Sequence, residues 1–177
     1  MDRNQTSRLI IRRLAAYFLD CLLCFTILIG FQVLLYFTAG GFPFRLLTTG
    51  PLIEAWVFST VSFPVWLFFS LNECSRRQAT PGKRLLHLQV TNLQGERISF
   101  GRALLRAVVK LLPWEITHLT IMLPVPWNQD PSAGFRPGLY LVYGLVAVYL
   151  VVMYFNPRGR SVDDLVAGTV VETIPGG

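Results

Sequence analysis

An acidic residue inside a long apolar segment is the first feature of this chain that could do chemistry. Asp20 is the only formally charged residue between Leu14 and Phe37. A carboxylate inside a membrane is costly unless it is matched by a proton, a cation or a positive side chain. Arg13 lies seven positions earlier, on the same helical face but about 10 Å away along the axis. We therefore expect Asp20 and Arg13 each to find a partner on another segment of a helical bundle.

A second set of charged side chains forms a basic stripe. Arg102, Arg106 and Lys110 recur every four residues on one predicted helix, which Ser99 can cap. These side chains either extend to lipid headgroups, which we favour, or bring Arg106 or Lys110 inward to an acid such as Asp20 or Asp164.

Two further positions combine acids with a histidine. Glu115 and His118 are three positions apart and hence neighbours on one helical face. They either line a polar contact between helices, which we favour, or pass a proton. Glu54, near the start of another apolar run, either lies at the membrane interface, which we favour, or is a buried functional acid.

Other kinds of chemistry have little support. Cys21 and Cys24 form a CxxC pair with no second Cys or His cluster nearby, so we interpret them as packing residues and expect no metal site. His87 is expected on the polar side of a strand. The chain has no HExxH motif, and we find no nucleophile with a positioned base. We expect neither an enzyme nor a cofactor.

The composition indicates a small polytopic membrane protein. Of the 177 residues, 53% are apolar and 15% are charged, whereas about a quarter are charged in soluble domains. The runs Leu14–Phe37, Leu52–Leu71 and Leu139–Phe155 are long enough to cross a bilayer. The first run follows basic residues and is too long for a signal-peptide core, which predicts an uncleaved signal anchor. The net charge of +6 comes from basic residues beside these runs, so it indicates topology and not nucleic-acid binding.

The segment from Ala103 to Trp127 decides the number of spans. If it crosses the membrane, the chain is an all-α membrane protein with about four transmembrane helices. Both termini then lie in the cytoplasm, because Lys and Arg concentrate before the first span, between the second and third, and in the tail. If it is interfacial or re-entrant, there are three spans and the tail lies outside. We favour four spans, in a single domain covering residues 1–177.

The polar segment between the second and third spans predicts a short cytoplasmic β-hairpin. Apolar and polar residues alternate over 86–91, residues 92–96 supply a turn, and the second short strand is expected over residues 97–100.

A tight turn is expected at Thr80, Pro81, Gly82 and Lys83. The glycine spacing of a phosphate-binding loop is absent, and Arg84 stands where that motif has Ser or Thr, so we expect no nucleotide site. Lys83 and Arg84 are expected to contact phospholipid headgroups or the acids of the tail.

Three separated motifs carry a resemblance to a known family. They are RLAAYFLD at 13–20, the stretch from QATPGKRLL to SFGRALLR at 78–106, and DLVAGTVV at 164–171. Together they resemble the RDD family of bacterial integral membrane proteins. The resemblance places the family's arginine on Arg13 and its aspartates on Asp20 and Asp164, and the chain has Asp163 where relatives often have histidine. It implies a bacterial cytoplasmic membrane protein, and exchange of sodium or other monovalent cations for protons has been attributed to some members.

Two functions remain as expectations. The first is a small transporter or monovalent cation/proton exchanger with a buried charge network, in which an ion or proton binds when an arginine leaves its carboxylate. The expected members of this network are Arg13, Asp20, Asp164, Arg106, Glu115 and His118. Four spans are few for a transport pathway, so we expect a homodimer surrounded by membrane lipids. The alternative is a non-transporting membrane adaptor or assembly factor whose Arg and Asp residues are structural.

Overall fold

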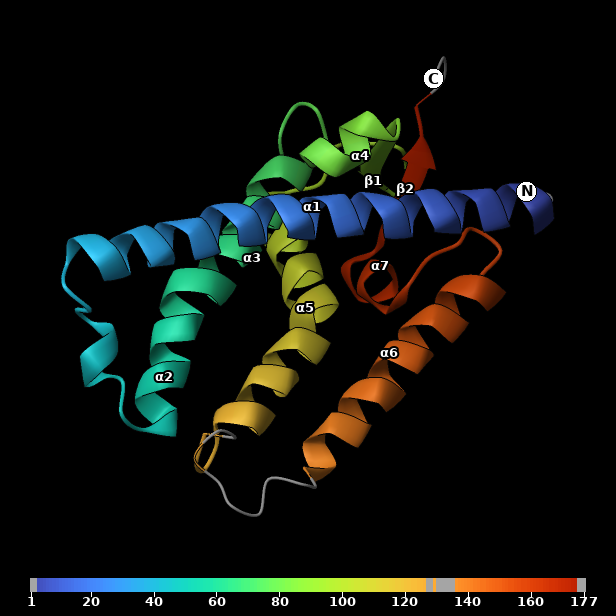
Figure 1. Ribbon diagram of the computed structural model, residues 1–177. Coiled ribbons are helices and arrows are strands. Elements are labelled where there is room, and N and C mark those ends of the chain that lie inside the picture. Colours follow the sequence, from blue (N-terminus) through green and yellow to red (C-terminus); the bar gives the residue numbers. More distant parts are fainter. Residues whose placement is uncertain (1–2, 127–128, 130–135, 175–177) are drawn as a thin grey trace.

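The computed structural model describes residues 3–126, 129 and 136–174 and is mostly helical (Figure 1). A π-helical turn, η2 (Phe58–Ser62), joins two helices, and two short strands form one sheet. The helices are α1 (Arg3–Thr38), η1 (Phe44–Leu46), α2 (Gly50–Val57), α3 (Phe63–Glu73), α4 (Pro81–Leu85), α5 (Phe100–Met122), α6 (Pro137–Phe155) and α7 (Val162–Ala167), and the strands are β1 (Leu88–Asn92) and β2 (Thr169–Thr173).

Within the described residues, three helical segments are long and apolar enough to cross a membrane. They are Asn4–Thr38, Gly50–Glu73 and Pro137–Phe155, and they contain the three apolar runs predicted from the sequence. The helix α5 is continuous through Pro113 but is not among the three. A mostly helical membrane protein is therefore confirmed, and the fourth span stays a prediction.

The helix α1 has the character of a lipid-facing helix along most of its length. Large apolar side chains such as Phe18 (67% exposed) and Phe37 (75% exposed) point away from the rest of the chain, as expected for a helix that is apolar all round. The helix ends where Gly40 and Gly41 adopt positive φ angles of 60° and 88°, a conformation that glycine adopts without steric cost.

The predicted β-hairpin is wrong in its second strand. The strand β1 forms, but it pairs antiparallel with β2 from the C-terminal tail, with Val90 opposite Val171. Residues 97–100 do not form a strand because this stretch begins a helix: the Ser99 side chain caps α5 by accepting from the N–H of Arg102. The tail instead supplies two adjacent buried valines, and Val171 packs in one core cluster with Leu88 and Val90.

The helix α5 is the central element. It contacts α3, α6 and α7, and Figure 1 shows it between α2 and α6, with α1 running across the upper ends of these helices. The short helix α4 contacts α1. This arrangement brings the end of α3, the first turns of α5 and the C-terminal tail together.

Candidate functional site

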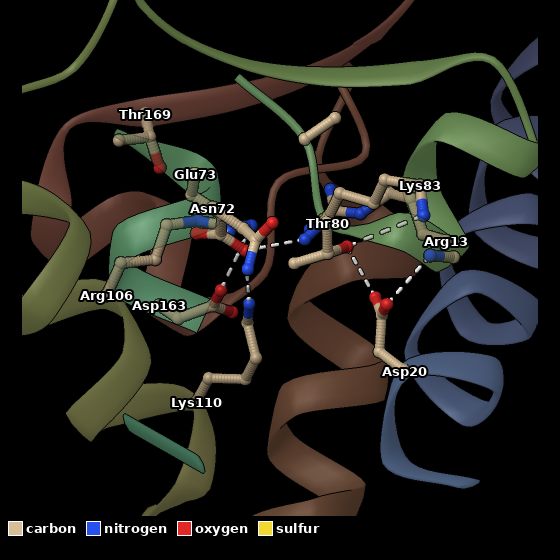
Figure 2. Close-up of polar contacts among 12 residues, drawn as sticks. Arg13, Asp20, Asn72, Glu73, Thr80, Lys83, Arg106, Lys110, Asp163 and Thr169 are labelled. Atoms are coloured by element: carbon tan, nitrogen blue, oxygen red, sulfur yellow. Dashed lines mark hydrogen bonds and ion pairs between the residues drawn. The ribbon is translucent and has the colours of Figure 1, made fainter. Parts of the chain in front are cut away.

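Arg106 lies at the centre of a buried charge network where α3, α5 and α7 meet (Figure 2). Its side chain is 1% exposed. Its Nη1 lies 2.5 Å from Oε2 of Glu73, and its Nη2 lies 2.8 Å from Oδ1 of Asp164 and 3.3 Å from Oδ2 of Asp163. The planar guanidinium can satisfy several carboxylates at once, so one residue links two distant parts of the chain.

Glu73, the last residue of α3, accepts from three cations. Its Oε2 binds Arg106, and its Oε1 lies 2.5 Å from Nζ of Lys83 and 2.9 Å from Nζ of Lys110. The carboxylate has no exposed surface, so these partners provide the compensation that a buried charge requires. Sequence reasoning missed Glu73 because it lies two residues beyond the predicted span. The available signal was a single acid directly after an apolar run and before a strongly basic segment.

Arg13 joins α1 to the tail. Its guanidinium donates to Oδ2 of Asp164 and to the carbonyl of Gly159. Asp164 also accepts from the Ser161 N–H and from the Thr169 hydroxyl, each at 3.1 Å. Burial alone would raise the pKa of Asp164, but the two arginines outweigh burial and lower this pKa below its usual range.

Asp20 is fully buried and is bound by α4. Its Oδ2 accepts from the Thr80 hydroxyl at 2.5 Å (Figure 2). Its Oδ1 accepts from the Gly82 N–H at 2.7 Å. A Cβ atom at Gly82 would lie 2.4 Å from the Ala16 carbonyl oxygen, so glycine permits this close approach. Among the described residues, no ion pair includes Asp20. The tight turn predicted at residues 80–83 is the start of α4, which Thr80 caps and which packs against α1.

The partners of Lys83 and Arg84 differ from the lipid headgroups and tail acids that were expected. Lys83 is 6% exposed and pairs with Glu73. Burial lowers the pKa of Lys83 to about 8, and the neighbouring carboxylate offsets this only in part. Arg84 donates to the side chain of Asn72 at 3.0 Å and to the carbonyl of Ala79 at 2.9 Å. Both basic side chains therefore connect α4 to neighbouring parts of the chain.

The basic stripe on α5 is exposed at one position and belongs to the charge network at the other two. Arg102 is exposed, whereas Arg106 and Lys110 turn inward. Both therefore depart from the favoured expectation of headgroup contact. Arg106 pairs with Asp164, as the alternative expected, and both residues also pair with Glu73, which neither alternative named. Phe69 supports the arrangement because the Lys110 ammonium lies 4.6 Å from the centre of its ring.

A cavity of about 340 Å³ opens beside the network. Side chains of α5 and α6, such as Trp114 and Met153, form its apolar wall, and its polar end contains four cations and one acid: Arg13, Lys83, Arg106, Lys110 and Asp163. The Oδ2 atom of Asp163 is buried and, among the described residues, has no hydrogen-bond partner. This oxygen lies 3.3 Å from Nη2 of Arg106, so an ion or proton that binds it would compete with that arginine.

Glu115 and His118 lie outside this network. They share a face of α5 with each other, and Glu54 of α2 approaches them, with one ligand atom of each residue within 4.8 Å of the others. Glu54 is 9% exposed and faces α5. The structure thus brings Arg13, Arg106 and Asp164 into one group, holds Asp20 separately, and gives Glu115 and His118 a different acidic partner.

Comparison with known proteins gives one match. A model described as RDD family matches residues 8–168. No curated protein and no solved structure matches the chain.

Proposed function

Since the family match over residues 8–168 shows that the chain belongs to the RDD family, we propose that this membrane protein exchanges a monovalent cation for a proton. The observation that carries the proposal is the buried network around Arg106. This network borders a cavity at Asp163, whose Oδ2 makes a 3.3 Å ion pair with Arg106 and, among the described residues, no hydrogen bond. Ionisable side chains are rare in the interior of a membrane protein, and where they occur they often mark ion or proton pathways.

The charge balance of the network supports exchange over simple uptake. Three acids of the network, Glu73, Asp163 and Asp164, face four bases, Arg13, Lys83, Arg106 and Lys110. An additional cation would add positive charge to a site of low dielectric, which is unfavourable. Release of one proton as the cation enters removes this penalty.

Lys83 is the group best suited to release that proton. Its pKa is lowered to about 8, so at neutral pH it is protonated but close to titration. A cation held by Asp163 and Glu73 would compete with Lys83 for the Glu73 carboxylate and lower the pKa further. In this mechanism the cation and the proton occupy the network alternately.

The arrangement of the protein in the membrane belongs to the same proposal. The helix α5 serves as the fourth span, both termini lie in the bacterial cytoplasm, and two copies associate as a homodimer within the lipid. The concentration of basic residues near the N-terminus and between residues 72 and 102 supports this orientation.

The experiment that tests exchange is a flux assay on the full chain in liposomes. A gradient of Na⁺, K⁺ or Li⁺ is applied, and the internal pH is followed with a dye. We expect Asp163→Asn to reduce flux at least tenfold. The variant should stay folded, because Asp163 makes the longest of the three acid contacts to Arg106. Glu172→Gln, at an exposed position of β2, is the matched control and should leave flux unchanged. Wild-type flux no greater than that of Asp20→Asn or Asp163→Asn would contradict exchange.

An adaptor or assembly role is the second candidate. The observation favouring it is that the network joins α1, α3, α4, α5 and the tail, so its residues could serve only to hold the fold together. In that case Asp163→Asn and Asp164→Asn would lower stability or abundance, and neither the wild type nor the variants would move ions.

A further inference from the structure

Glu54, Glu115 and His118 form a second polar cluster, on the side of α5 that faces α2. One potential ligand atom from each side chain lies within 4.8 Å of the other two. Glu115 follows Arg106 by nine positions, about 14 Å along the helix, so this cluster is separate from the charge network.

Each of the three side chains has a buried atom without a partner. Within the described part of the chain, Oε2 of Glu54, Oε1 of Glu115 and Nδ1 of His118 are inaccessible and make no hydrogen bond. An unsatisfied buried polar atom is unfavourable, because it has lost its hydrogen bonds to water without gaining a partner. Since the same three side chains also bring potential ligand atoms within 4.8 Å of one another, a bound ligand that contacts all three would satisfy them.

The charge of the cluster indicates what that ligand is. None of the ion pairs formed between described residues includes Glu54 or Glu115. Two carboxylates this close repel each other, and α2, which carries Glu54, belongs to an apolar segment. A cation of charge +2 would neutralise both carboxylates at once, whereas a neutral imidazole adds a third ligand without adding charge.

The backbone holds the ligands in place. A Cβ atom at Gly50 would lie 1.9 Å from the carbonyl oxygen of Met122, so glycine permits α2 and α5 to come into direct backbone contact there. Glu54 lies one turn further along α2, on the same face, and therefore points at α5. The ring of His118 is set by Trp114, with ring centres 4.5 Å apart. Sites on packed helices are more rigid than sites on loops.

A cavity adjoins the cluster. Glu54 and Glu115 line a cavity of about 590 Å³ that is bounded by Phe58, Trp66 and Leu112. The adjoining η2 turn is π-helical, a local geometry often found at functional sites.

We propose that Glu54, Glu115 and His118 bind a divalent transition-metal ion such as Zn²⁺ or Mn²⁺. Two carboxylate oxygens and one imidazole nitrogen suit these ions, whereas Mg²⁺ and Ca²⁺ prefer oxygen ligands alone. Ligands about 2.1 Å from a tetrahedral ion lie about 3.4 Å apart, so side-chain rotations that move these atoms by about 1 Å complete the site. The spacing of Glu115 and His118 did not predict a metal site because the third ligand comes from α2, more than sixty residues away in the sequence.

Metal titration of the purified full chain in detergent tests this proposal. ZnCl₂, MnCl₂ and MgCl₂ are added separately and followed by calorimetry. We expect one Zn²⁺ per chain, weaker Mg²⁺ binding, and a loss of Zn²⁺ affinity of at least tenfold in Glu54→Gln and in Glu115→Gln. Exposed His87 and Glu172 give the matched controls, His87→Gln and Glu172→Gln, which should bind Zn²⁺ as the wild type does.

The glutamine variants keep side-chain shape and remove charge repulsion, so they should fold even if His118→Gln does not. The proposal is overturned if the wild type binds no Zn²⁺, if both glutamine variants bind it unchanged, if Mg²⁺ binds as tightly, or if binding disappears in His87→Gln. The assay needs no ion flux, so its result is independent of whether the protein is an exchanger.

Discussion

Nη1 of Arg106 lies 2.5 Å from Oε2 of Glu73 in the interior of the protein, although 33 positions separate the two residues in the sequence. The pair joins the end of α3 to the first turns of α5, and both side chains are almost completely buried. Their contact decides where the rest of the network can form, because Lys83 and Lys110 bind the same glutamate and Asp164 binds the same arginine.

Breaking this pair on one side should strongly destabilise the protein. We expect Arg106→Gln or Glu73→Gln to lower the free energy of unfolding by about 3–5 kcal/mol, because each leaves buried charges uncompensated. Thermal unfolding in detergent measures the effect, and Arg102→Gln, at an exposed position four residues away, is the control. The double variant should lose less than the sum of the single losses. Simple additivity would mean that the two residues act independently.

A methyl group at Gly82 should separate α4 from α1. The Cβ of Gly82→Ala would lie 2.4 Å from the Ala16 carbonyl oxygen and 3.0 Å from the Asp20 carboxyl, so backbone must move and the Gly82 N–H bond to Asp20 weakens. We expect a loss of about 2–3 kcal/mol, measured by thermal unfolding. Gly101→Ala has nothing within 4 Å and should be neutral or slightly stabilising. Equal losses in the free energy of unfolding for Gly82→Ala and Gly101→Ala would argue against the packing of α4 on α1.

Stability should increase as pH rises above 8, because of Lys83. Its pKa falls from 10.5 in the unfolded chain to about 8 in the folded protein, so between these values the unfolded state binds more protons. The free energy of unfolding then rises with pH across this window. The melting temperature between pH 7.5 and 10.5 measures this trend, and Lys83→Met should flatten it. A pH dependence in the wild type that rises no more than that of Lys83→Met over this range would contradict the lowered pKa of Lys83.

The sequence predicted local features well and distant partners poorly. The apolar runs and the carboxylate in the first of them were sufficient to indicate membrane helices and a buried Asp20. The partner of β1 could not be inferred, because β2 lies about 80 residues away and strand pairing at that distance leaves no local signal. Glu73 was missed for a related reason: its three cations come from α4 and α5, and no spacing connects them. Periodicity identifies which face of an element is buried, but not what covers it.

Shortening Val171 tests the corrected pairing of the sheet. Val171 is 1% exposed, lies opposite Val90 and packs in a core cluster with Leu9 of α1. We expect Val171→Ala to lower the free energy of unfolding by about 2 kcal/mol, because buried apolar area is lost and a cavity remains. Thermal unfolding measures the loss, and Ile174→Ala, at a position 37% exposed beyond the end of β2, should have a smaller effect. If β1 paired instead with residues 97–100, Val171→Ala would be close to neutral, since the tail would then lie outside the core.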